Sequence, residues 1–292
     1  MICTLCPRRC GAVRTETEAG GFCGQPMRPV VARAALHFGE EPCISGTRGS
    51  GTIFFTGCNL RCCFCQNETI SRGGTGRPVT VARLREIFRA LEDRGAHNIN
   101  LVTGTQFTPA IAEALEEPRS VPVVWNSSGY ESPETLRLLE GKVQVYLPDF
   151  KYADGALAQR LSGAADYPDR AAEALREMLR QTGPCQTDGD GLLRRGVLVR
   201  HLLLPGKPEN AKGVIDRVRA LCPPGSIRFS LMSQYVPLGE ALTMPDMARR
   251  VRRAEYRAAV SYLTACGFTD GYTQEPDAAT TDMIPAFDLT GV

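Results

Sequence analysis

The stretch GTIFFTGCNLRCCFCQN, residues 51–67, joins a short β-rich run to four closely spaced cysteines. Its run TIFF predicts a strand, and the loop that follows carries Cys58, Cys62 and Cys65 in the spacing C-x3-C-x2-C. Three thiolates from one loop would leave one iron of a [4Fe–4S] cluster without a protein ligand, so that a small molecule can bind there. The alternative is that these cysteines pack or bind zinc, although a structural zinc site usually has four protein ligands. Cys63 breaks the spacing, and we expect it to be a packed bystander.

The composition is that of a soluble globular protein. The chain has 292 residues, 43% hydrophobic and 23% charged, which suits one large α/β domain with an appendage. Lys and Arg number 34 against 32 Asp and Glu, a balance that does not indicate a nucleic-acid or membrane-surface partner. No apolar run approaches the ~20 residues of a membrane-spanning helix, and the N-terminus lacks the apolar core of a secretory signal. We expect a cytoplasmic protein with no nucleic-acid and no membrane partner.

From residue 51 onward, β-rich runs alternate with runs of helical periodicity. Strands alternating with helices predict right-handed crossovers and a parallel sheet. Six such units indicate a partial (β/α)6 TIM-like barrel, with an open doubly wound sheet as the alternative. The predicted strands are 52–55, 98–102, 121–125, 143–147, 196–204 and 226–232, and the predicted helices are 79–94, 109–117, 132–140, 167–182, 210–221 and 244–266. The predicted domains are an N-terminal Cys-rich metal-binding cap (1–50), the core (51–270) and a C-terminal tail (271–292).

A second group of cysteines lies near the N-terminus. Cys3, Cys6, Cys10 and Cys23 offer four thiolates, enough to close a metal site. We expect zinc or a rubredoxin-like iron that holds the cap, with an auxiliary iron–sulfur cluster as the alternative. The single cysteines are expected to be small buried hydrophobic residues: Cys43, Cys185, Cys222 and Cys266.

Polar residues follow or end the predicted strands after the first, where catalytic groups of such barrels collect. Asp149 and Lys151 alternate with one residue between them, so both should face the same side, as cofactor binders or as a structural ion pair. Arg200 and His201 must face opposite sides. We favour Arg200 as a carboxylate binder, and leave His201 as a core histidine or a catalytic acid or base. Tyr235 is expected to be a packed aromatic residue rather than a radical relay.

These motifs together resemble one known family. The loop Cys58-x3-Cys62-x-Phe64-Cys65 after the first strand resembles the radical S-adenosylmethionine (radical SAM) superfamily. The words PDFKY (148–152), RHLLLPG (200–206) and SLMSQY (230–235) narrow the resemblance to pyruvate formate-lyase activating enzyme-like proteins. The resemblance covers nearly the whole chain. It extends to a branch that also carries an N-terminal Cys-x2-Cys-Pro-Arg-x-Cys.

The resemblance implies a [4Fe–4S] cluster held by Cys58, Cys62 and Cys65, with S-adenosylmethionine on its open iron. Reductive cleavage then yields methionine and a 5′-deoxyadenosyl radical, which abstracts a hydrogen atom. The protein supplies positioning, electrostatics and exclusion of solvent. The residues implied in cofactor binding are Thr103, Gly104 and Thr105 for the methionyl amino group, Asn126 and Ser128 for the ribose hydroxyls, Asp149 and Lys151 facing the cofactor, and Phe64 through its backbone at the adenine.

Several functions remain open at this stage. The first is hydrogen abstraction from a protein or peptide, including the glycine of a glycyl-radical enzyme, with a flavodoxin- or ferredoxin-like reductant. The second is the same chemistry on a small molecule, or the installation of a peptide modification. An electron-transfer iron–sulfur protein is a third, although an electron carrier needs neither an open iron nor a barrel. A zinc-binding nucleic-acid module fits least, since the chain has a net charge of only +2 and lacks interleaved aromatic residues.

Overall fold

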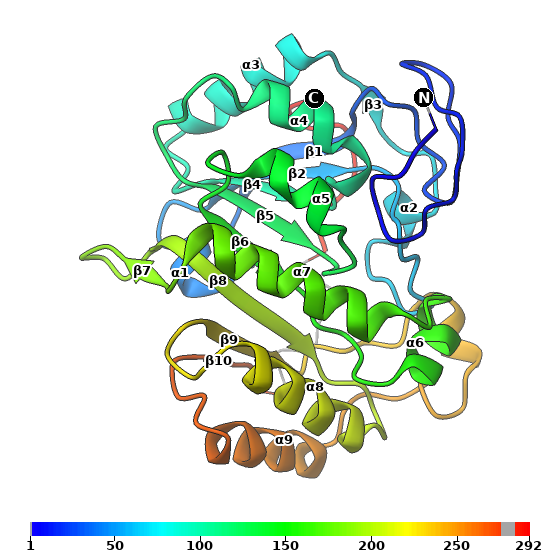
Figure 1. Ribbon diagram of the computed structural model, residues 1–292, viewed down its shortest axis with the longest axis vertical. Helices are drawn as coiled ribbons and strands as arrows, with labels where there is room; N and C mark the ends of the chain where they lie inside the picture. The colour runs from blue at the N-terminus through cyan, green and yellow to red at the C-terminus, as the bar shows by residue number, and fades with distance from the viewer. Residues whose placement is uncertain (1, 276–283) are drawn as a thin grey trace.

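The computed structural model describes residues 2–275 and 284–292 and contains one main sheet covered by helices (Figure 1). Along the sheet the strand order is β10-β9-β8-β6-β5-β4-β2-β1-β3, with β7 beside β8. The strands are β1 (Val30–His37), β2 (Ser50–Phe55), β3 (Arg77–Pro78), β4 (Ile99–Val102), β5 (Val123–Ser127), β6 (Val145–Pro148), β7 (Gln186–Thr187), β8 (Leu193–Leu202), β9 (Arg228–Met232) and β10 (Gly271–Thr273).

The helices follow the parallel strands and contact one another in chain order. α3 packs against α4, α5 against α7, α7 against α8 and α8 against α9, so they form one outer layer (Figure 1). The α-helices are α1 (Pro42–Ser45), α2 (Glu68–Ser71), α3 (Val81–Asp93), α4 (Thr108–Ala114), α5 (Pro133–Leu136), α6 (Gly155–Ser162), α7 (Tyr167–Thr182), α8 (Pro208–Leu221) and α9 (Arg253–Ala265). The 3₁₀ turns of the described residues are η1 (Thr105–Phe107), η2 (Arg137–Leu139) and η3 (Gly239–Thr243).

Helix α3 illustrates why these segments are helical. The side chain of Thr80 accepts a hydrogen bond from the amide of Arg83 and so caps the helix N-terminus. The apolar residues recur at three- and four-residue intervals and are all buried against the sheet: Leu84, Ile87, Phe88 and Leu91.

The predicted α/β fold with a mostly parallel sheet is confirmed. β2, β4, β5, β6, β8 and β9 pair in parallel with their neighbours, in the order in which they occur along the chain. A doubly wound sheet reverses its strand order midway, so that alternative is wrong. β10 adds a further parallel strand beside β9, within the segment predicted as a tail.

Side chains of the parallel strands alternate between two faces of the sheet. The inner face carries several polar side chains. On β5, Trp125 is buried in the large core cluster and Asn126 faces inward to the polar side chains described below. On β8, Arg200 faces inward and His201 outward. The Nδ1 atom of His201 lies 2.8 Å from the carbonyl oxygen of Phe150, and burial lowers the pKa of this histidine to about 4. His201 is therefore a neutral core histidine.

The segment before the sheet is a loop, residues 2–28, which we call the N-terminal cysteine loop. Isolated bridges pair Ile2 with Val13 and Gly20 with Gln25. The chain then enters the sheet as β1, antiparallel to β2, a strand that the sequence analysis did not predict. The C-terminal residues lie against β1, with the amide of Ala34 donating to the carbonyl of Thr290.

The predicted helix 244–266 is wrong over its first turns, because α9 begins only at Arg253. Pro245 disfavours helical backbone at Met244, the residue before it. The carboxylate of Glu255 accepts hydrogen bonds from the amide of Arg252 and from the guanidinium of Arg249, which fixes the helix start. Within the described part of the chain, every helix is too short or too polar to cross a membrane.

Candidate active site at the strand ends

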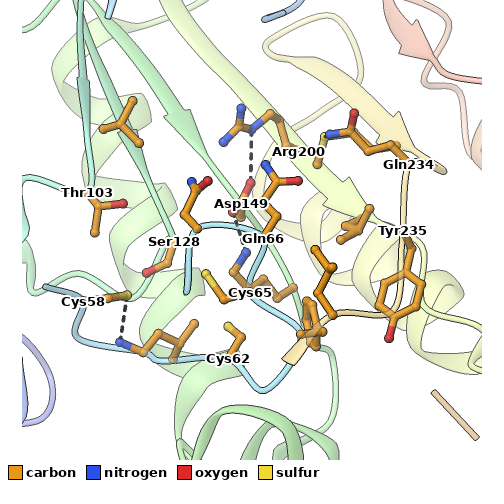
Figure 2. A pocket seen from close by; sticks show the side chains of 18 of the residues that line it. Cys58, Cys62, Cys65, Gln66, Thr103, Ser128, Asp149, Arg200, Gln234 and Tyr235 are labelled. Atoms are coloured by element: carbon orange, nitrogen blue, oxygen red, sulfur yellow. Dashed lines mark hydrogen bonds and ion pairs between the residues drawn. The ribbon is translucent and has the colours of Figure 1, made fainter. Parts of the chain in front are cut away.

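A pocket opens where the parallel strands end, and it brings together most of the predicted site residues (Figure 2). It is lined by the loop after β2 and by the ends of β4, β5, β6, β8 and β9. Of the predicted residues, the following line it: Cys58, Cys62, Phe64, Cys65, Thr103, Asn126, Ser128, Asp149, Lys151 and Arg200. Further lining residues, which the sequence analysis did not assign to the site, include Gln66, Asn67, Gln234, Val236, Leu238 and Ile284.

Three of the four cysteines in the loop of residues 57–67, the cluster loop, face this pocket. Figure 2 shows the sulfur atoms of Cys58, Cys62 and Cys65 in the pocket wall. The thiol of Cys63 instead lies 3.8 Å from the sulfur of Met244 and is not part of the lining. The donor set thus fits a cluster with three thiolate ligands and one iron left open.

The thiols sit in a buried environment. Burial raises the pKa of Cys65 to about 12, and the neighbouring thiols of Cys62 and Cys58 add to this effect. Burial also raises the pKa of Cys58. Binding of a metal must therefore release these protons.

No three Cys, His, Asp or Glu side chains of residues 2–275 and 284–292 come close enough together to hold one metal ion. A [4Fe–4S] cluster offers a separate iron to each thiolate, so its ligands need not meet at one point. The arrangement of the three pocket thiols is compatible with such a cluster.

Charged groups just after β6 and on β8 form a largely buried network beside the thiols. Asp149 accepts from Lys151 Nζ at 2.6 Å and from Arg200 Nε at 3.1 Å. Burial alone would lower the pKa of Lys151, but the carboxylate of Asp149 raises it above its ordinary value. Burial would raise the pKa of Asp149, and the two cations hold it below its usual range. Both cations are therefore charged at neutral pH, next to the pocket thiols.

Glu40 completes this network, and the sequence analysis missed it. Its carboxylate accepts from Arg200 Nη1 at 3.0 Å, from Asn126 Nδ2 at 3.0 Å and from Asn100 Nδ2 at 3.1 Å. Arg200 Nη2 also donates to Asn126 Oδ1 at 2.7 Å. Three of the guanidinium donors of Arg200 are thus directed at protein acceptors, whereas Lys151 has one hydrogen bond to a carboxylate in the described residues. Glu40 stands outside every motif, so no sequence signal marked it.

The segment after β4 only partly reaches the pocket. Thr103 lines it with a positive φ of 59°. The chain then turns into η1, so Gly104 and Thr105 do not line the pocket. Thr105 Oγ1 donates instead to the fully buried carboxylate of Glu131 at 2.7 Å. Burial raises the pKa of Glu131 to about 7, although the hydrogen bond from Thr105 lowers it.

Ser128 and the backbone around it support the cluster loop. The side-chain amide of Asn59 donates to the carbonyl of Tyr130 at 2.7 Å, and Ser128 Oγ donates to Asn59 Oδ1 at 3.4 Å. Phe64 packs against Tyr235 with ring centroids 5.8 Å apart. Tyr235 donates its hydroxyl to the carbonyl of Met247, as expected for a packed aromatic residue.

The N-terminal cysteine loop lies beside the cluster loop. All four of its cysteines are free thiols: Cys3, Cys6, Cys10 and Cys23. The guanidinium of Arg14 donates to the sulfur of Cys3 at 3.3 Å. The carbonyl of Cys23 packs on Gly57, where an added Cβ would lie 2.8 Å from that oxygen. The predicted second metal site is not shown by this arrangement.

Comparison with known proteins gives a consistent picture. A family model described as the Radical SAM superfamily matches residues 52–216. Uncharacterized protein MJ0674 of Methanocaldococcus jannaschii is 30% identical over 270 residues, which cover 88% of this chain and 73% of that protein.

Solved structures of SuiB from Streptococcus suis share the fold. The complex with precursor peptide SuiA matches with a TM-score of 0.51 at 14% identity, over 75% of this chain and 47% of that one. The complex with S-adenosylmethionine matches with a TM-score of 0.50 at 13% identity, over 75% of this chain and 48% of that one. This chain spans about half the length of the SuiB chains, and the similarity shows the fold alone.

Proposed function

The chain belongs to the radical SAM superfamily, and on this premise we propose that it abstracts a hydrogen atom from a protein or peptide in the pocket at the strand ends. Membership implies an enzyme that uses S-adenosylmethionine and a [4Fe–4S] cluster. Together, when bound, these supply a 5′-deoxyadenosyl radical by one-electron cleavage of S-adenosylmethionine. The proposed subclass is that of the pyruvate formate-lyase activating enzyme-like proteins.

One observation carries the proposal: three thiols from one loop and a largely buried pair of cations line the same pocket. Cys58, Cys62 and Cys65 would hold the cluster. Lys151 lies in the same wall, so its ammonium would bind the carboxylate of the methionyl group. Arg200 would hold Asp149 and Asn126 in place for the amino group and the ribose hydroxyls.

A protein or peptide substrate is proposed from the apolar part of the pocket lining. Val236, Leu238 and Ile284 lie in the lining together with the polar strand ends. Such a wall would shield a radical from water and would accept a peptide backbone with small side chains, as at a glycine. SuiB, whose fold this chain shares, has been solved with a precursor peptide. A small-molecule substrate is the competing proposal, and a flavodoxin- or ferredoxin-like protein is the proposed reductant.

The experiment is anaerobic. The full chain is reconstituted with iron and sulfide and reduced, S-adenosylmethionine is added, and 5′-deoxyadenosine is measured. We expect cleavage in the wild type and in Cys63→Ala, and its loss in Cys62→Ala. Cluster formation without cleavage in the wild type would favour an electron-transfer protein. Deuterium transfer from labelled peptides into 5′-deoxyadenosine then tests the substrate class.

We also propose that Cys3, Cys6, Cys10 and Cys23 hold a second metal centre, either zinc or iron. In the described residues these thiols do not converge on one point, so binding of the metal would have to draw them together. Its support is the presence of four free thiols in one loop beside the cluster loop. Iron and zinc are measured in the wild type and in Cys6→Ser, with Cys266→Ser as the control. Loss of one metal only in Cys6→Ser is expected, and equal metal content in all three proteins would refute the second centre.

A further inference from the structure

We infer that Arg8 is a positioning residue for the cluster loop and ties that loop to the N-terminal cysteine loop. The inference rests on the proposed function, because the loop matters for catalysis only if Cys58, Cys62 and Cys65 hold a cluster. The contacts of Arg8 described below do not depend on that cluster.

The guanidinium of Arg8 is directed at backbone carbonyls from two different segments. It donates to the cluster loop at Asn59 (2.8 Å) and Leu60 (3.4 Å). On its other side it donates to Ser162 (2.8 Å) and to Gly163, at the C-terminal end of α6. A helix end carries partial negative charge on its free carbonyls, so a cation is favourable there. Arg8 therefore joins the cluster loop to the end of α6.

The same guanidinium belongs to an aromatic contact. Arg8 lies 3.9 Å from the centroid of the Phe22 ring, and Arg61 of the cluster loop lies 5.0 Å from the same ring. The Phe22 ring is thus contacted by one arginine from each loop. Arg61 has a positive φ of 54°, a backbone conformation that costs energy unless the surroundings hold it.

The consequence concerns the direction of the thiols. Cys62 and Cys63 follow Arg61 directly, and the amide of Cys63 donates to the carbonyl of Leu161 at 2.9 Å. When Arg8 holds the carbonyls of Asn59 and Leu60, the turn at Arg61 directs Cys62 to the pocket and leaves Cys63 packed. Arg8 lies between Cys6 and Cys10, so whatever fixes the N-terminal cysteine loop also fixes the cluster loop.

The test is hydrogen exchange on the full chain, first in its reduced, metal-free form. The reporter is the fragment that covers residues 56–66, which contains the hydrogen-bonded Cys63 amide. Arg8→Gln is compared with the wild type and with Arg9→Gln, a control at the exposed neighbouring arginine. Because hydrogen bonds from a charged donor are stronger than neutral ones, and Arg8 makes several to these two segments, we expect exchange at least about tenfold faster in Arg8→Gln. Arg9→Gln should match the wild type, and Arg8→Lys should recover part of the protection.

A second readout separates positioning from a general loss of stability. After reconstitution, the electron paramagnetic resonance spectrum of the reduced protein is recorded with and without S-adenosylmethionine, and iron is counted. We expect Arg8→Gln to take up less iron or to lose the spectral change caused by S-adenosylmethionine, while its far-UV circular dichroism is unchanged.

The two proposals fail in different ways. Equal exchange of residues 56–66 in Arg8→Gln and the wild type, or no protection of this fragment in the wild type, would overturn the role of Arg8. A wild-type protein that takes up no cluster, while Arg8→Gln still exchanges faster, would overturn the proposed function and leave the Arg8 contact intact.

Discussion

Replacing Glu131 by Gln should make the protein more stable at high pH relative to the wild type. Glu131 is fully buried and receives a hydrogen bond from Thr105 Oγ1 at 2.7 Å. Burial disfavours the charged carboxylate and raises the pKa from 4.5 to about 7 in the folded chain. Gln has nearly the same shape and keeps an acceptor for Thr105, but it has no proton to lose.

The direction in which the free energy of unfolding changes with pH follows from the number of protons bound in the folded and unfolded states. Between pH 4.5 and about 7 the folded wild type keeps a proton that the unfolded chain releases, so its free energy of unfolding falls as pH rises. One pKa unit corresponds to about 1.4 kcal/mol, so the full loss is about 3 kcal/mol. The loss is absent at low pH and complete above pH ~7. The free energy of unfolding of Glu131→Gln minus that of the wild type should therefore rise by about 2–3 kcal/mol between pH 5 and pH 8.

The assay is urea denaturation of the metal-free, reduced chain at pH 5, 6, 7 and 8, followed by circular dichroism. Comparing two proteins cancels the titration of all other groups, and Glu134→Gln, an exposed glutamate near the start of α5, is the control. For the control, the difference in free energy of unfolding from the wild type should not change with pH. If the difference for Glu131→Gln is also independent of pH, or falls as pH rises, the burial argument is refuted.

Three further predictions follow from the site. Gly57→Ala should strongly reduce iron uptake, measured by iron analysis, because the residue has a φ of 82° and an added Cβ would lie 2.4 Å from Cγ of Gln25. An iron content equal to that of the wild type would contradict this packing. Asp149→Asn should lower the free energy of unfolding by about 2–4 kcal/mol in a denaturation experiment, because it leaves the largely buried cations Lys151 and Arg200 without their shared carboxylate. A loss below about 1 kcal/mol would show that Glu40 alone compensates Arg200. Cys63→Ser should keep the iron content and spectrum of the wild type, and Cys65→Ser should not, since of these two cysteines only Cys65 lines the pocket. Equal behaviour of the two variants would refute the three-ligand assignment.

Much of the site was visible in the sequence because it depends on local spacing. The spacing of Cys58, Cys62 and Cys65 places three thiols in one short loop after a strand, and period-two alternation puts Asp149 and Lys151 on one side. The same alternation separates Arg200 from His201, and the strongly apolar strand around His201 agrees with its burial. The parallel sheet also followed from the alternation of strand and helix patterns, whereas the choice between a barrel order and a doubly wound order needed the structure.

Other contacts of the site join segments that are distant in the chain, and no local sequence pattern predicts them. Glu40 reaches Arg200, 160 residues later in the chain, because β1 adds to the sheet beside β2 and brings the following loop to the barrel interior. Thr105 was expected at the cofactor, but its hydroxyl is directed to Glu131, whose burial only the packed structure reveals. Arg8 meets the end of α6 across 154 residues. The sequence by itself determined the parallel α/β class and the loop with three thiols, since both rest on local patterns and spacing. The tertiary structure decided the strand order, which charges are paired and what holds the cluster loop. Those contacts join segments that are far apart in the chain, and no local sequence pattern encodes them.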